Sequence, residues 1–123
     1  MLARRDPIES YRRVEFDARV VGANAAQLVD LCLEQLVGAI DRTLYAQRCD
    51  DNRMKSDAMA RGIAALSSLL MGVDPSSPLG GPLAQLYSSA RRTLIDCAVR
   101  FDAAALTAIR SDFEEIRVAL NAG

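Results

Sequence analysis

The stretch that decides the fold is AAQLVDLCLEQLVGAIDRTLYAQ, residues 25–47. Its apolar residues recur three and four positions apart, which is the period of an α-helix: Val29, Leu33, Leu36, Val37, Ile40 and Leu44. A second apolar row leaves only a narrow polar strip, which holds Gln27, Asp30, Glu34 and Asp41. An ordinary surface helix is apolar over about a third of its circumference, and this helix exceeds that. It is therefore either the central helix of a bundle or a helix with one face for another chain.

Three further helical patterns follow, over residues 52–71, 82–100 and 103–120. Asn24 and Asp102 are plausible N-caps for the first and last helices, because their side chains can accept hydrogen bonds from free backbone N–H groups. The connection 48–51 is short, which makes the helices on either side antiparallel neighbours. The segment GVDPSSPLGG, residues 72–81, is a loop. We therefore predict an all-α, antiparallel four-helix bundle.

The last helical segment carries an apolar stripe with alternating spacings of three and four: Leu106, Ile109, Phe113, Ile116 and Leu120. We expect this stripe to face the core. The other side is charged and is expected to be solvated: Arg110, Asp112, Glu114, Glu115 and Arg117.

A chain of 123 residues predicts one domain, residues 1–123, of which residues 1–23 are the least regular and form a mobile, partly ordered leader. The net charge of −1 argues against a nucleic-acid partner, which favours a basic face. No apolar run approaches the ~20 residues of a membrane span, and no signal peptide is evident. We therefore expect a cytoplasmic protein without stable membrane insertion and with reduced cysteines.

The chain has no histidine. This absence removes Ser-His and Cys-His nucleophile pairs, the Glu-x-x-His ligands of di-iron bundles and the usual zinc and haem ligand sets. No paired carboxylates lie within an apolar stripe, as a buried acid-base site would require. The sequence thus predicts a protein that is not an enzyme and has no cofactor, no metal and no catalytic residue.

Several short motifs follow one another along the chain. They are Ile8-x-x-Tyr11, residues 27–31 at the start of the first long helix, residues 69–74 followed by Gly80-Gly81, then Leu86-Tyr87, Leu94-Ile95 and residues 100–102. In this order and spacing they resemble the motifs of the FliS family of flagellar secretion chaperones, which has Ile/Leu-x-x-Tyr near its N-terminus. Leu33-Glu34-Gln35 stands where the family usually has an aromatic residue, Asp and Gly, which indicates a divergent member.

The resemblance implies a cytosolic chaperone that binds the C-terminal segment of flagellin, prevents its premature polymerisation and delivers it to the flagellar export gate. It also implies that the client lies partly as helices in apolar grooves. The alternative is a structural or oligomerising bundle whose apolar surface is a permanent homodimer interface. We expect a monomer or a weak homodimer.

We predict that the client contacts apolar residues of the central helix, backed by the third: Leu33, Val37, Ile40, Leu44, Leu83 and Tyr87. The open alternative is that Leu33 belongs to the core. By the resemblance, Ile8 and Tyr11 help to cover the groove without client and become available to the export gate when the client displaces them. The other possibility is that both residues pack on the bundle and never move.

Overall fold

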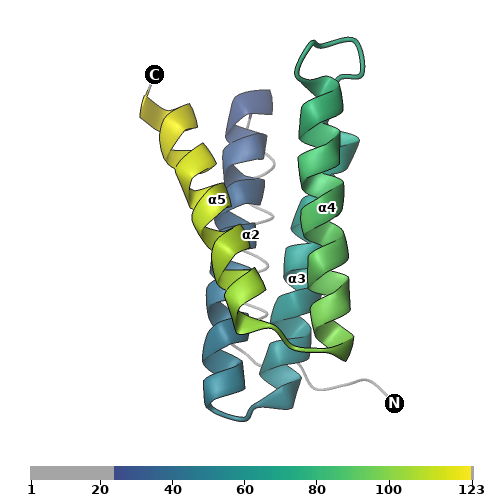
Figure 1. Ribbon diagram of the computed structural model, residues 1–123. Helices are drawn as coiled ribbons and strands as arrows, with labels where there is room; N and C mark the ends of the chain where they lie inside the picture. The colour runs from purple at the N-terminus through teal and green to yellow at the C-terminus, as the bar shows by residue number, and fades with distance from the viewer. Residues whose placement is uncertain (1–23, 123) are drawn as a thin grey trace, which may run out of the picture.

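The computed structural model of the chain describes residues 24–122, which form four α-helices and contain no strand. The helices are α2 (Ala25–Arg48), α3 (Asn52–Met71), α4 (Gly80–Val99) and α5 (Ala103–Ala122). Consecutive helices run in opposite directions, as Figure 1 shows. The predicted all-α class and the antiparallel four-helix bundle are confirmed.

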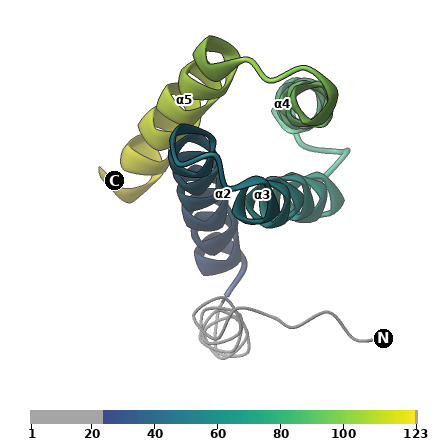
Figure 2. The ribbon, with the colours of Figure 1, turned by 90° about the horizontal axis from the view of Figure 1, so that it is seen from below.

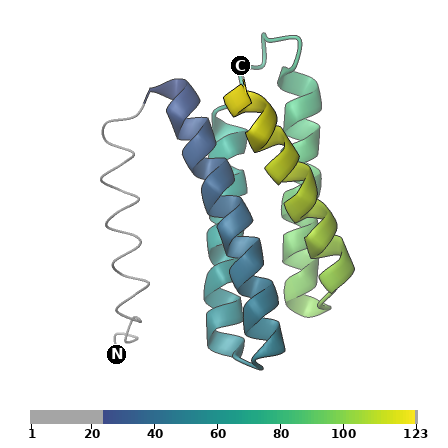
Figure 3. The same ribbon diagram turned by 90° about the vertical axis from the view of Figure 1, so that its left-hand side faces the viewer.

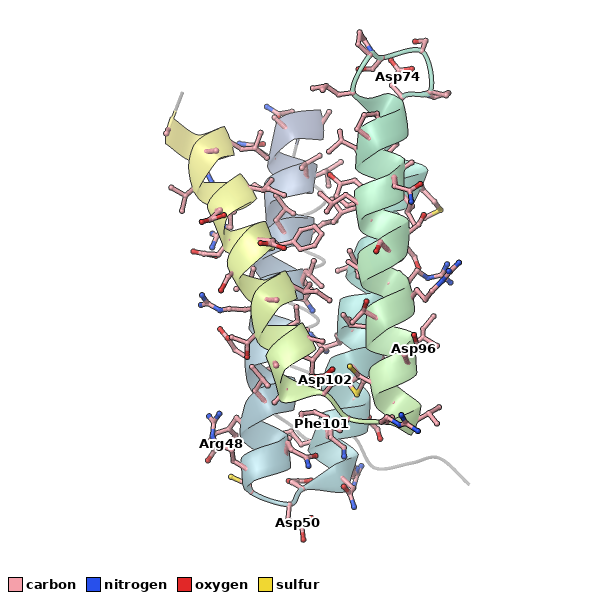
Figure 4. All side chains as sticks on the ribbon, viewed as in Figure 1. Arg48, Asp50, Asp74, Asp96, Phe101 and Asp102 are labelled. Carbon is pink, nitrogen blue, oxygen red and sulfur yellow. The ribbon has the colours of Figure 1, made fainter. Side chains whose placement is uncertain are left out.

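Asparagine and aspartate side chains cap the N-termini of three of the four helices. The Asn24 side chain accepts a hydrogen bond from the Gln27 backbone N–H at 2.9 Å, and the Gln27 side chain accepts one from the Asn24 N–H at 3.0 Å. This reciprocal pair is a capping box. The carboxylates of Asp51 and Asp102 accept bonds of 3.0 Å from the N–H groups three residues later. Figure 4 shows Asp102 at the connection between α4 and α5, at the opposite end of the bundle from Asp74.

The third helix begins earlier than the proline at position 82 predicts. It starts at Gly80, and no side chain caps it. The Gly80 N–H instead donates to the Ser77 carbonyl at 2.9 Å, so the turn of the loop leads directly into the helix. A Cβ at position 80 would collide with the backbone carbonyl of Asp74. The close approach of the loop therefore explains the glycine.

The four helices form an open bundle rather than a closed square. The central pair, α2 and α3, has the most extensive contact; α4 packs on α3, and α5 packs on α2. The outer helices α4 and α5 contact each other least, and Figure 2 shows them at the two edges of the arrangement. Both Figure 1 and Figure 2 show α5 diverging from α4 toward its C-terminal end, and Figure 3 shows α5 inclined to α2.

The core lies between α2, α3 and the inner sides of the outer helices. Its largest fully buried side chains are Phe113, Leu33, Leu36, Ile40, Leu66, Leu94 and Leu106. The apolar stripe predicted for the last helix is only partly internal, because Ile109 and Ile116 are half-buried and Leu120 is 59% exposed. The divergence of α5 from α4 accounts for this difference.

Candidate partner-binding face

Several apolar side chains of α4 and α5 remain incompletely covered. On α5, the row of Leu106, Phe113 and Leu120 lies beside the row of Ile109 and Ile116, because residues seven apart share a side of a helix. Only Leu106 and Phe113 of these five are fully buried. On α4, Leu83 is half-buried and Ile95 is 45% exposed. We call this surface the α4–α5 face, and it consists of Leu83, Ile95, Ile109, Ile116 and Leu120.

An aromatic pair connects the two helices beneath this face. The rings of Tyr87 from α4 and Phe113 from α5 stack with centroids 6.1 Å apart and an interplanar angle of 26°. Burial, with a smaller contribution from the Cys32 thiol, raises the pKa of the Tyr87 phenol. Tyr87 is therefore neutral at physiological pH and acts through packing.

The sequence-predicted client residues lie mostly beneath the surface. Leu33, Ile40, Val37 and Tyr87 are 0%, 1%, 6% and 5% exposed and belong to the core cluster. Leu44 and Leu83 are half-buried against that cluster. For Leu33 the structure agrees with the alternative that it belongs to the core. A contact between these six residues and a client stays a prediction, and Ile8 and Tyr11 lie outside the described residues.

The other flank of α5, away from the α4–α5 face, contacts α2 through charged side chains. Arg110 donates from Nε to Oδ1 of Asp41 at 3.0 Å and from Nη2 to Oδ2 at 3.4 Å. Arg117 donates to Asp30 at 3.2 Å and to Glu34 at 3.4 Å. The hydrogen bond to Asp41 raises the pKa of Arg110. We call these contacts the α2–α5 ion pairs.

Sequence reasoning missed the α2–α5 ion pairs because it placed Arg110 and Arg117 on a solvated surface. The residue spacing in the sequence could have indicated these ion pairs. The two arginines are seven residues apart, as are Glu34 and Asp41 in the acidic strip of α2. Two antiparallel helices with matched heptad spacing bring such groups together twice, here as Arg110 with Asp41 and Arg117 with Glu34.

The described residues offer little reactive chemistry. Within residues 24–122, no three His, Cys, Asp or Glu side chains are grouped to hold a metal ion. The three cysteines are free, and burial raises the pKa of Cys32 and Cys97, which keeps both thiols protonated and weakly nucleophilic. The partly exposed apolar side chains of α4 and α5 can contribute apolar contact to a partner.

A comparison with protein-family models matches residues 7–122 to the family described as flagellar protein FliS. The chain belongs to this family. The match confirms the resemblance found in the sequence motifs, and the family is one of flagellar chaperones rather than of enzymes. A search of curated proteins found no match. Within residues 24–122, no helix has both the length and the apolar character needed to cross a bilayer.

Proposed function

We propose that this protein is a cytosolic export chaperone that binds the C-terminal segment of flagellin, prevents its premature polymerisation and delivers it to the export gate. Membership of the FliS family supports the general role. The observation that supports the binding mode is the exposure of Leu120. It occupies a core position of α5, seven residues after Phe113, and yet is 59% exposed. A client helix on the α4–α5 face would cover it.

The energetics favour a helical client over an extended one. An amphipathic helix can cover the face with residues spaced three and four apart while all its backbone groups stay hydrogen-bonded. Burial of roughly 400 Å² of apolar surface contributes on the order of 10 kcal/mol before the costs of association. Ordering a disordered tail offsets much of that gain. Tyr87 and Leu33 belong to the core cluster against which residues of this face pack, so these two sequence-predicted residues remain part of the proposal.

The predicted role of the leader is part of the same proposal. Ile8 and Tyr11 cover the client site when it is empty, and client displaces them so that the export gate can engage them. Tethering gives the leader a high effective concentration at the site, so it competes although it binds weakly.

Two substitutions on α5 test the location of the site. Leu120 and Val118 are both 59% exposed and lie two residues apart, so they point to different sides of the helix. We expect Leu120→Asp to weaken binding of the flagellin C-terminal segment by at least about tenfold, because it places a charge against the client's apolar stripe. Val118→Asp should leave the affinity within about twofold. Titration calorimetry measures both, and circular dichroism verifies that helicity is retained.

Equal loss of binding in the two variants would contradict the α4–α5 face as the site. If the unmodified protein binds no flagellin, the proposed function itself is wrong.

A further inference from the structure

The two halves of α5 are held in different ways, and the first half is held by packing. The connection that leads into it is fixed by Phe101, whose ring centroid lies 5.4 Å from the ammonium group of Lys55. Leu106 and Phe113, each 1% exposed, then bury the inner side of the helix in the core cluster. Residues 103–113 are therefore part of the core of the bundle.

The second half of α5, residues 114–122, is held to α2 by polar contacts. None of its residues is fully buried, and Ile116 packs half-buried against the core cluster. Arg117 and Asn121 both donate hydrogen bonds to Asp30, at 3.2 and 2.9 Å. Because the Arg117 side chain is 30% exposed, water and salt weaken its ion pairs, and pairs of this kind contribute little stability.

A carboxylate at the start of this second half favours its release. Glu114 lies four residues after Arg110 and three before Arg117, so it shares the side of α5 that contacts α2. Its Oε2 atom is buried and accepts no hydrogen bond in the described structure. Such an oxygen costs free energy, because it has lost water without gaining another donor. Movement of residues 114–122 away from α2 returns water to this oxygen, which offsets part of the loss of the Arg117 contacts.

Val37 lies on the part of α2 that α5 covers. It comes three residues after Glu34 and four before Asp41, and both of these carboxylates pair with arginines of α5. The spacing puts the three side chains on one side of α2, with Val37 opposite Glu114 in the antiparallel pair of helices. Val37 is 6% exposed and is one of the residues that the sequence predicts as a client contact. A client reaches it only when α5 moves.

We propose that residues 114–122 form a hinged segment that opens away from α2 while residues 103–113 stay packed, and that the contacts of Arg117 hold it closed. The hinge is at Phe113, the last fully buried residue of α5. A segment of this length is not a stable helix without tertiary contacts, so it is partly unfolded when open. The opening does not depend on a client. The use that we infer for it, access of the client to Val37, rests on the proposed function.

Alkylation of an introduced thiol in the full-length protein measures the opening. Val37→Cys and Ala65→Cys place a thiol at two positions that are each 6% exposed, and in residues 24–122 the helix of Ala65, α3, does not pack on α5. Iodoacetamide reaches a buried thiol through an open state, so the labelling rate reports the population of that state. Peptide mass spectrometry should show labelling at position 37 at least about tenfold faster than at position 65. Circular dichroism verifies that both variants are folded.

Salt and charge test whether the contacts of Arg117 hold the segment closed. Raising the ionic strength from about 0.01 M to about 1 M should speed labelling at position 37 about three- to tenfold, and at position 65 less than about twofold. Adding Arg117→Gln to Val37→Cys should have a similar effect at low salt and remove most of the salt dependence. The control Arg92→Gln, at an exposed position of α4, should do neither. Equal labelling at the two positions, or a rate at position 37 that neither salt nor Arg117→Gln changes, would overturn the inference.

The flagellin C-terminal segment tests the use of the opening. Because the closed segment must be released before a client reaches Val37, Arg117→Gln should bind flagellin about three- to tenfold more tightly than Arg92→Gln at low salt in titration calorimetry. Bound flagellin should also slow labelling at position 37 at least about tenfold. Equal affinities, or a thiol that bound flagellin leaves unprotected, would contradict access to Val37 and leave the proposed function intact. If the unmodified protein binds no flagellin, the proposed function and the client access fail together, while the labelling rates still decide the opening.

Discussion

Phe113 is the largest fully buried side chain of the described bundle, at 1% exposed. It ties α5 to both neighbours, because its ring stacks on Tyr87 of α4 while Leu33 and Ile40 of α2 belong to the same core cluster. Leu106 is the other fully buried residue of α5, and Ile109 and Ile116 pack against the same cluster. The sequence predicted Phe113 on the inner stripe, and its burial confirms that placement.

We expect Phe113→Ala to lower the free energy of unfolding by about 3–5 kcal/mol, as large-to-small changes in cores do. Urea unfolding followed by circular dichroism measures the change. The matched control is Glu115→Ala, two residues away and exposed, which should change stability by less than about 0.5 kcal/mol. Similar losses in both variants would mean that the inward side of α5 is misassigned.

At the scale of the element, α5 differs from the other helices in how it is held. Its apolar contact is small, and the α2–α5 ion pairs lie along one flank while the other flank forms part of the α4–α5 face. Asn121 adds a hydrogen bond of 2.9 Å to Asp30 near the end of the helix. Polar contacts on one side therefore help to hold α5 against α2, and the α4–α5 face on the other side keeps its apolar side chains.

Arg117 contacts two carboxylates with 30% of its side chain exposed, so Arg117→Ala should destabilise the protein by about 1 kcal/mol at low salt. Raising the ionic strength from about 0.01 M to about 1 M shortens the screening length from ~30 Å to ~3 Å and should remove much of that difference. Denaturant unfolding at the two salt concentrations measures both effects. Arg92→Ala, an exposed position of α4, serves as the control and should show neither. A loss of stability that is independent of salt would show that Arg117 acts through packing of its aliphatic stem.

At the scale of the whole molecule, the described chain is a bundle with an incomplete side. Two central helices are covered by one outer helix each, and the outer helices separate instead of closing on each other. The apolar residues Leu120 of α5 and Ile95 of α4 are left 59% and 45% exposed. Under the proposed function a client helix covers this face, whereas in the oligomerising alternative a second copy of the chain covers it.

We expect the protein to elute from a sizing column as a monomer and to form a one-to-one complex with the flagellin C-terminal segment. Light scattering on the eluted peaks gives both masses. The physical reason is that a few partly exposed apolar side chains suit one amphipathic helix better than a second rigid bundle. A stable dimer that persists when flagellin is added would instead support the structural, oligomerising alternative.

Local signals in the sequence were sufficient to predict the four helices of the described residues. The caps at Asn24 and Asp102 and the apolar repeats act within a few residues, so the predicted helix ends agree with the structure to within two residues. The order of the motifs was also sufficient to identify the family, and the match over residues 7–122 confirms that identification. Helix ends and motif order depend on residues that are close together in the sequence, so the sequence alone determines them.

Only the tertiary structure decided which apolar surfaces face inward. The surplus apolar surface of the central helix predicts a client site, and Leu33 and Ile40 belong to the core because α3 and α5 both pack on α2. A contact of these residues with a client stays a prediction. Leu120 has the same periodicity as Phe113 and is exposed because α5 diverges from α4. Periodicity specifies the side of a helix on which a residue lies, whereas the distance between helices specifies whether anything covers it.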